Sequence, residues 1–278
     1  MPELPELQAH AERLEREFGG AVLERFLPLT FTALKTVTPP PDAAYGRPLV
    51  GIGRRGKYLL ADFGPATFVV HLMQGGRLRV DEKQSAKPRF GQARWKFADG
   101  RAWLLTEAGT ERRAGVWVVE GDPASQTPLA ALGPDADTLD PPQLLKLLHA
   151  NSMRLHGFLR DQHIVAGVGR RLANEVCHRA KLSPFASTGK LTQDDAERLV
   201  AVIRETVEEG LAYDRRRDDM SSSGDRPGGV HHRVGEACPV CGDTIRSVEY
   251  RTYTVAYCPT CQTGGRVLAD NTTSKFLK

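Results

Sequence analysis

Long apolar runs are missing from this sequence of 278 residues. None approaches the roughly 18 residues that a membrane-spanning helix needs, so we expect no membrane partner. The N-terminus reads Met-Pro-Glu-Leu-Pro-Glu, with acids where a secretory signal carries basic residues, and we therefore expect a cytoplasmic protein. Only five cysteines are present, and in that compartment they are expected to be thiols or metal ligands rather than disulfides.

The charges also show no strong excess of one sign, because 38 Lys and Arg residues stand against 34 Asp and Glu residues and leave a net charge of +4. A mildly basic chain permits a polyanion such as nucleic acid as partner but does not require one. The hydrophobic fraction of 40% is that of an ordinary globular protein, and the length suffices for two domains.

The first part of the chain combines one helix with short strands. Residues 3–18 carry apolar side chains three and four positions apart, which predicts an amphipathic helix that ends at Gly19-Gly20. Strands are expected at Val22–Leu27, Leu49–Ile52, Tyr58–Phe63, Thr67–Leu72, Arg77–Val80, Ala93–Phe97 and Ala102–Leu105. Their spacing favours a sandwich or a barrel.

The character of the chain changes after about residue 133, where helices replace strands. A short helix is expected around Leu144–Leu148, and longer ones at Leu172–Lys181 and Thr192–Leu211. Thr192 with Asp195 forms a capping box that opens the last helix. A polar loop rich in Gly and Ser follows at residues 213–229, so the chain as a whole is predicted to be α+β.

Four of the cysteines form two pairs near the C-terminus. Cys238-Pro-Val-Cys241 and Cys258-Pro-Thr-Cys261 are C-x₂-C motifs, each presenting two thiolates at the separation that tetrahedral Zn²⁺ requires. On the arms of a β-hairpin they would close a four-thiolate shell with no open coordination position, which predicts one structural rather than catalytic Zn²⁺ ion. Cys177 lies in an expected helix and is interpreted as a small buried apolar residue.

Pro2 and Glu3 allow two interpretations. Proline in the first turn and an acid at the positive end of a helix are ordinary helix-starting residues. Once Met1 is removed, however, Pro2 exposes a secondary amine. An α-amino group has a pKa of about 8, so part of it is unprotonated at neutral pH and can attack a sugar C1′ to form a Schiff base. Glu3 and Glu6 would then supply carboxylates for proton transfer.

The basic segment Gly53-Arg54-Arg55-Gly56-Lys57 joins two expected strands and is equally open. It is either a solvated hairpin tip or a phosphate-binding turn whose lysine donates or shuttles a proton. The residues alone do not decide between these interpretations.

In combination, these motifs resemble the formamidopyrimidine-DNA glycosylase and endonuclease VIII (Fpg/Nei) family, in the same order along nearly the whole chain. The resemblance is carried by Pro2–Glu6, Gly53–Leu60, Val70–Leu72, Leu132–Asp135, Asp161-Gln162, Val165–Gly169, Ala173–Glu175 and Tyr257–Gln262. It implies an N-terminal helix plus β-sandwich domain in 1–133 and a linker with a short helix in 134–150. A helix–two-turns–helix DNA-binding domain would occupy 151–229, and a zinc hairpin with a tail 230–278.

The resemblance also implies a function, DNA base-excision repair by a monomeric bifunctional glycosylase/AP lyase that acts on double-stranded DNA with a damaged base or an abasic site. Pro2 would be the Schiff-base nucleophile, Glu3 the acid/base, Glu6 a supporting carboxylate and Lys57 the proton donor in β-elimination. The expected DNA contacts are Arg55, His71, Gln74, Arg112, Arg170 and Arg251. Residues 213–229 would be the loop that caps the lesion.

Departures from the family pattern concentrate on residues expected to face DNA. The Met, Arg and Phe that fill the space left by a flipped base correspond here to Gln74, Arg112 and Ala114. A glutamine can still wedge into the stack, whereas Ala114 cannot intercalate. An Asn after Gly-Val-Gly is replaced by Arg170, a longer and charged phosphate donor. We therefore expect an altered lesion preference.

The zinc hairpin departs as well, because Tyr253 occupies the position of the phosphate-clamping arginine, five residues before the third cysteine. Arg251 lies two residues earlier, on what would be the same face of a strand, and is either a stand-in or a plain surface residue. Since this arginine also assists δ-elimination in the family, β-elimination is expected and δ-elimination is left open.

Two further classes stay open beside the enzyme. One is a non-catalytic damaged-DNA-binding protein that keeps the fold, which the changed wedge and clamp positions allow. The other is a zinc-ribbon protein acting on RNA or proteins, which explains the cysteines but not Pro2, Glu3, Glu6 and Lys57. Nicking of an abasic duplex distinguishes the enzyme from the binder.

Overall fold

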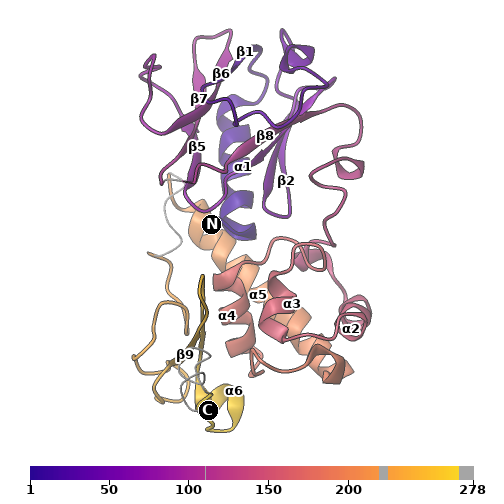
Figure 1. Ribbon diagram of the computed structural model, residues 1–278, viewed down its shortest axis with the longest axis vertical. Coiled ribbons are helices and arrows are strands. Elements are labelled where there is room, and N and C mark those ends of the chain that lie inside the picture. The colour runs from indigo at the N-terminus through magenta and orange to yellow at the C-terminus, as the bar shows by residue number, and fades with distance from the viewer. Residues whose placement is uncertain (110, 219–224, 269–278) are drawn as a thin grey trace. The chain divides into compact units, whose positions relative to one another are not determined.

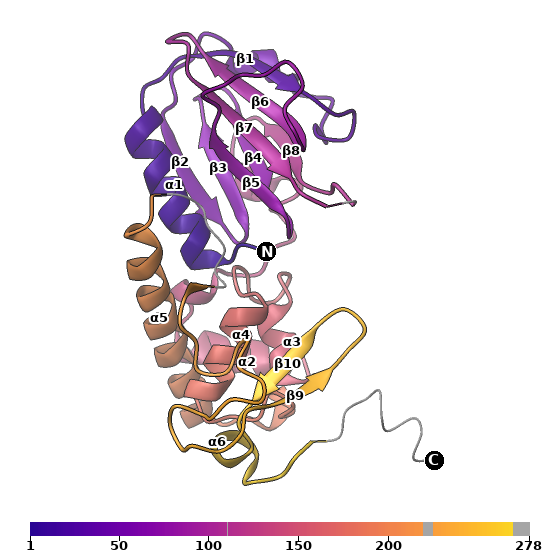
Figure 2. The same cartoon turned by 90° about the vertical axis from the view of Figure 1, so that its left-hand side faces the viewer.

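A computed structural model describes residues 1–109, 111–218 and 225–268 in two compact units (Figures 1 and 2). Unit 1 comprises Met1–Leu132 and Leu211–Ser223, and unit 2 comprises Gly133–Gly210 and Gly224–Lys278. Among the described residues, no helix has the length and apolar character needed to cross a bilayer. Part of the expected loop 213–229, residues 219–224, lies outside the described residues.

Unit 1 contains one helix and two antiparallel four-stranded sheets. Its elements are α1 (Leu4–Phe18), β1 (Leu23–Pro28), β2 (Gly51–Arg55), β3 (Tyr58–Asp62), β4 (Thr67–His71), β5 (Gly76–Val80), β6 (Gly91–Phe97), β7 (Ala102–Glu107) and β8 (Gly115–Val119). The sheet orders are β1-β6-β7-β5 and β2-β3-β4-β8. The helix and all seven strands expected from the sequence are present, and β8 is an additional strand that pairs with β4.

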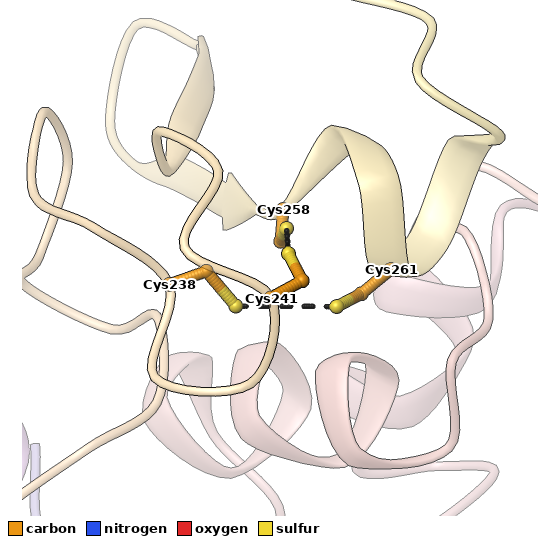
Figure 3. Close-up of side chains that lie close together, drawn as sticks. All are labelled: Cys238, Cys241, Cys258 and Cys261. Carbon is orange, nitrogen blue, oxygen red and sulfur yellow. Dashed lines mark hydrogen bonds between the residues drawn. The ribbon is translucent and has the colours of Figure 1, made fainter.

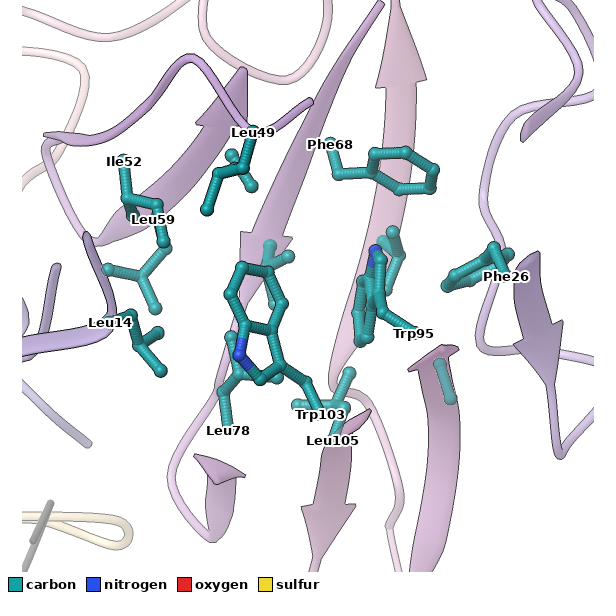
Figure 4. Packing of buried hydrophobic residues seen from close by; sticks show 14 of the residues in the cluster. Leu14, Phe26, Leu49, Ile52, Leu59, Phe68, Leu78, Trp95, Trp103 and Leu105 are labelled. Carbon is teal, nitrogen blue, oxygen red and sulfur yellow. The ribbon is translucent and has the colours of Figure 1, made fainter. Parts of the chain in front are cut away.

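The core of unit 1 is made by side chains from both sheets and from α1, which confirms the sandwich (Figure 4). Leu14 and Phe18 of α1 belong to this core, as do Trp95 and Trp103, each about 1% exposed. The ring of Phe18 lies 5.1 Å from that of Trp103 in an edge-on arrangement, a geometry that aromatic pairs favour. This packing fixes α1, and therefore its N-terminal end, against the sheets.

Unit 2 is helical apart from one hairpin. Its elements are α2 (Pro141–Ala150), α3 (Leu155–Arg160), α4 (Arg170–Arg179), α5 (Gln193–Arg215), β9 (Arg246–Glu249), β10 (Thr254–Tyr257) and α6 (Pro259–Thr263), α5 ending in unit 1. Thr192 caps α5 as expected, since its hydroxyl accepts from the Asp195 backbone N–H while the Asp195 carboxylate accepts from that of Thr192. The sequence did not predict α3.

The two turns between α3 and α4 are held by one side chain. Gln162 donates to the Val168 carbonyl at 2.9 Å and accepts from the Gly167 N–H at 3.0 Å. Gly133 approaches the same turns so closely that a Cβ there would lie 2.3 Å from the Ile164 carbonyl oxygen. This is the helix–two-turns–helix that the sequence predicted.

Residues 211–223 have their contacts with unit 1, although they follow the helices of unit 2 in the chain. Arg13 of α1 donates to the backbone carbonyls of Asp214 at 3.2 Å and Arg217 at 2.8 Å. Glu12 accepts two hydrogen bonds from the Arg215 guanidinium, at 2.7 and 2.8 Å. These bonds attach the first part of the expected loop 213–229 to α1.

Candidate active site and nucleic-acid interface

The N-terminal end of α1 buries two acids beside Pro2. Glu3 is the N-cap residue, its side chain accepts from the Glu6 backbone N–H, and the Glu6 carboxylate accepts from the Glu3 N–H at 2.5 Å. Both acids are about 5% exposed and Pro2 is buried, while Met1 is 47% exposed. The structure thus confirms the helix-starting interpretation of these residues. It also holds two carboxylates rigidly at the residue whose amine would react.

The β2–β3 hairpin is not a solvated tip. Gly56 adopts a left-handed φ of 55°, and Lys57 beside it is buried, with 8% of its surface exposed. A buried ammonium is costly unless polar groups hold it, so this lysine is positioned rather than free to sweep through solvent. Arg55 is half-buried, and its guanidinium lies 3.4 Å from the Leu132 carbonyl oxygen.

His71 ends β4 next to this hairpin, because it pairs with Tyr58 in the sheet register. Its ring centroid lies 4.6 Å from that of Tyr58. Burial, and then the positive charge of Lys57, lower the pKa of His71 to about 4, so the imidazole is neutral at pH 7. Nδ1 accepts from the Met73 N–H at 3.1 Å, which leaves the proton on Nε2 as a neutral donor.

The turn after His71 packs against the loop between β7 and β8. The Ala108 N–H lies 3.4 Å from the Gly75 carbonyl oxygen, and a Cβ at Gly75 would meet the Ala108 oxygen at 2.4 Å. Gln74 is exposed in this turn, and Met73 before it has a left-handed φ of 53°. The turn and the loop therefore form one joined edge of unit 1.

The β7–β8 loop carries the remaining expected contact of unit 1. Arg112 is exposed and has a left-handed φ of 41°. Ala114 is 1% exposed and belongs to the core, and its N–H donates to the buried Glu107 carboxylate at 2.6 Å. Gln74 and Arg112 thus lie on the surface, whereas Ala114 offers no side chain to a ligand.

In unit 2, the N-terminal end of α4 faces a cavity of about 530 Å³. Arg170, the first helical residue, lines it together with Asn174, His231 and Arg251. Helix N-termini favour anions because their N–H groups are unpaired and their dipole is positive. Two guanidinium groups beside such an end make this an electropositive cavity.

The expected placement of Arg251 on a strand is wrong. β9 ends at Glu249, β10 begins at Thr254, and the Tyr250 N–H donates to the Tyr253 carbonyl at 2.9 Å. Arg251 therefore lies in the two-residue hairpin turn, where the alternation of a strand does not apply. It still lines the cavity, because the turn itself reaches that far.

Tyr253, at the position of the displaced arginine, lies in an aromatic stack. Its ring lies 4.6 Å from that of Tyr250 at an interplanar angle of 11°, and 6.0 Å from that of His156 at 15°. The Arg160 guanidinium lies 4.1 Å from the centre of the Tyr253 ring. Arg160 was not singled out in the sequence, and no spacing rule connects α3 to this hairpin.

His231 is a second residue that sequence reasoning missed. Burial and then the charge of neighbouring His232 lower its pKa to about 3, so the ring is neutral. The Asn174 side-chain nitrogen lies 2.9 Å from Nδ1 and donates to it, which places the proton of His231 on Nε2. The cavity is thus lined by a neutral donor as well as by two cations.

The four cysteines come together as the spacing predicted (Figure 3). Their Sγ atoms all lie within 4.8 Å of one another, with 3.9 Å from Cys238 to Cys261 and 3.4 Å from Cys241 to Cys258. Four thiolates about 2.3 Å from a tetrahedral Zn²⁺ would be separated by about 3.8 Å. The donor set therefore fits a metal ion of this kind.

The thiol of Cys238 is prepared for ligation. Burial opposes its ionisation, but the backbone N–H groups of Val240 and Cys241 and the ring of His178 donate to the sulfur and lower its pKa to about 6. The first knuckle is closed by the Gly242 N–H, which donates to the Cys238 carbonyl at 2.9 Å.

Sequence profiles and relatives agree with this architecture. The formamidopyrimidine-DNA glycosylase N-terminal domain matches residues 1–117, and the formamidopyrimidine-DNA glycosylase H2TH domain matches residues 131–221. An uncharacterized formamidopyrimidine-DNA glycosylase-like protein of Mycobacterium tuberculosis is 40% identical over 158 residues, which cover 53% of this chain and 95% of the relative. The formamidopyrimidine-DNA glycosylase of Geobacter metallireducens is 31% identical over 275 residues, covering 95% of this chain and all of the relative.

The fold is shared with solved structures. The crystal structure of a mutant Lactococcus lactis FPG with Fapy-dG-containing DNA superposes with a TM-score of 0.82 at 22% identity, covering 94% of this chain and 100% of that one. Profiles, relatives and fold together define a two-domain protein of the formamidopyrimidine-DNA glycosylase class. The chain belongs to the Fpg/Nei family.

Proposed function

We propose that this protein is a DNA base-excision repair enzyme, a bifunctional glycosylase/AP lyase whose nucleophile is the amine of Pro2. The observation that carries the proposal is the buried cluster at the start of α1, where Pro2 adjoins Glu3 and Glu6 in a reciprocal capping box. It occurs in a chain whose first 117 residues match the N-terminal domain of formamidopyrimidine-DNA glycosylases. A binding protein would have no use for burying two carboxylates at this end.

The chemistry follows from the groups present. After Met1 is removed, the Pro2 nitrogen attacks C1′, the glycosidic bond breaks, and the base leaves with a proton. Glu3 serves as the acid/base for this step and for opening the sugar ring, and Glu6 holds the Glu3 backbone and thereby its orientation. The resulting iminium acidifies the C2′ proton, and its removal expels the 3′ phosphate. Water then releases Pro2 by hydrolysis.

Lys57 assists the elimination as a proton donor held in the β2–β3 turn. Its burial fixes the ammonium, and its charge keeps neighbouring His71 neutral. His71 then contributes a directed Nε2–H donor rather than a second cation. Arg55, Gln74 and Arg112 complete the contacts of unit 1 with DNA.

Unit 2 supplies the grip on the backbone of a duplex with a damaged base or an abasic site. Arg170 and Arg251 line the cavity at the N-terminal end of α4, where a phosphate would also meet the helix dipole. The cysteines Cys238, Cys241, Cys258 and Cys261 would hold a structural Zn²⁺ that keeps the hairpin folded. We expect a monomer, which light scattering after gel filtration tests.

Borohydride trapping tests the nucleophile, because it reduces the iminium to a stable protein–DNA bond. Wild-type protein with native Pro2 should give a covalent adduct with an abasic duplex, and Pro2→Gly should give far less. Retained Met1 should block trapping in the same way, since it converts the amine into an amide. Equal adduct yields from wild type and Pro2→Gly would show that another amine reacts.

The alternative of a non-catalytic damaged-DNA-binding protein makes the opposite prediction. Such a protein would bind an abasic duplex without nicking or trapping it. A screen of duplexes that each carry one lesion, covering oxidised purines, oxidised pyrimidines and bulkier adducts, would then define which base the enzyme removes.

A further inference from the structure

Helix α4 carries a second functional face beside the end that lines the cavity. Glu175 and His178 are three residues apart and therefore lie on the same side of the helix. Each is about 4% exposed, and both point at the segment that leads into the cysteine cluster. Charged and polar side chains are rarely buried without a specific partner, so the partners of this pair identify its purpose.

The partners of Glu175 are three consecutive backbone N–H groups. Its carboxylate accepts from Gly229 at 2.7 Å, Val230 at 3.1 Å and His231 at 2.8 Å. Three charge-assisted bonds to one short segment hold that segment rigidly against α4. The chain therefore enters the cysteine cluster from a fixed point on the helix.

The partner of His178 is a metal-ligating sulfur. Its Nε2 lies 3.3 Å from Sγ of Cys238, within hydrogen-bond distance of a sulfur acceptor. The ring has little freedom to leave, because Gly229 packs so closely that a Cβ there would lie 2.8 Å from Nδ1 of His178 and 3.1 Å from the Glu175 carboxylate. A thiolate bound to a metal accepts but does not donate, so the proton of this contact belongs to Nε2.

We propose that His178 is a positioning residue of the metal site, which donates its Nε2–H to the Cys238 thiolate and thereby couples the metal to helix α4. Four thiolates around a divalent cation carry a net charge of −2, and a donor to one sulfur disperses that charge. The same bond fixes the direction of the ligand. Outer partners of this kind typically change metal affinity by about 10- to 100-fold.

This proposal rests on the metal site of the proposed function but not on glycosylase chemistry, so metal binding is the quantity to measure. The probe is Co²⁺, whose thiolate charge-transfer band reports the sulfur ligands, with Zn²⁺ affinity from competition against a chromophoric chelator. Wild-type protein that bound neither metal would overturn the metal site itself. All other outcomes concern His178.

Two substitutions separate the hydrogen bond from packing. His178→Phe fills the volume but has no donor, and we expect it to lower Zn²⁺ affinity by about 10- to 100-fold and to shift the Co²⁺ band. His178→Gln keeps an amide N–H at about the position of Nε2 and should restore most of both. Arg179→Gln, at the next residue of α4, is the matched control, because that guanidinium pairs with Glu209 and not with a cysteine.

Three results would overturn the proposal. His178→Phe could match wild type in affinity and spectrum, His178→Gln could be as weak as His178→Phe, or Arg179→Gln could weaken binding equally. Circular dichroism of each variant at saturating Zn²⁺ shows whether α4 and its neighbours are folded. A variant that is unfolded with Zn²⁺ is replaced in the comparison by His178→Asn, whose shorter amide cannot reach the sulfur and should behave as the donor-free variant.

Discussion

The N-terminal end of α1 and the hairpin tip at Arg251 place functional residues in opposite ways. At α1, Pro2, Glu3 and Glu6 are buried and fixed by bonds that span three residues. At the hairpin, Arg251 and Thr252 are exposed in a two-residue turn, and the groups around them come from distant segments. Bond-making chemistry needs a fixed geometry, whereas a phosphate grip tolerates movement because charge acts over several ångströms.

The largest effect should come from the rigid end. Glu3→Gln removes the acid/base while a side-chain oxygen that can cap α1 remains, so single-turnover base excision should fall by about 10²- to 10⁴-fold. Trapping on a preformed abasic site should fall much less, because the base has already left. A thermal melt checks that the fold survives. Excision at the wild-type rate would remove Glu3 from the mechanism.

The next effect tests the flexible end through its metal. Cys258→Ala should lose the bound metal and weaken duplex binding by at least about 10-fold, since the hairpin loses the ions and bonds that fold it. Cys177→Ala is the matched control, because this cysteine is buried in α4 away from the cluster. Metal content by mass spectrometry and binding by fluorescence anisotropy give the comparison. Unchanged binding by metal-free Cys258→Ala would separate the hairpin from the grip.

A smaller effect is expected for single charges at the grip. Arg170→Ala and Arg251→Ala should each weaken duplex binding roughly ten-fold and reduce the slope of log affinity against log salt by about 1. Arg79→Ala, an exposed arginine of β5, should change neither. Anisotropy titrations at several salt concentrations measure both quantities. An unaltered slope in Arg251→Ala would make this residue a plain surface arginine.

The smallest effect concerns stability and pH in unit 1. Burial lowers the pKa of His10 to about 4 in the folded chain against about 6.5 when unfolded. The unfolded chain therefore binds a proton first, and stability is lost as the pH falls from about 6.5 towards 4. His10→Gln should flatten this loss by roughly 1–3 kcal/mol in urea unfolding at pH 7 and 5. The exposed His163→Gln should not.

Local pattern was enough to predict much of the fold and one complete site. Apolar spacing predicted α1, alternation predicted seven strands, and C-x₂-C spacing predicted the cysteine cluster, because each depends on neighbours in the chain. β8 was missed because its residues, Gly115–Val119, form a short apolar run without clear alternation. α3 was missed because six residues do not complete a periodic pattern.

The parts that sequence reasoning could not reach depend on contacts between distant segments. The stack of His156, Tyr250 and Tyr253 joins a helix to a hairpin about a hundred residues later, and no spacing rule links them. Arg251 was placed on a strand because alternation was extended past the actual turn. The burial of Lys57 was equally invisible, since a basic hairpin turn is usually exposed.

Helix α4 spans about 15 Å, from Arg170 at the cavity to His178 at the cysteine cluster. If metal occupancy favours the arrangement that binds a phosphate, thermodynamic reciprocity requires a bound phosphate to favour metal occupancy by the same factor. Duplex DNA would then slow the escape of the ion to a chelator. The protein would hold its metal most firmly while engaged on its substrate, and would be most open to metal exchange between encounters.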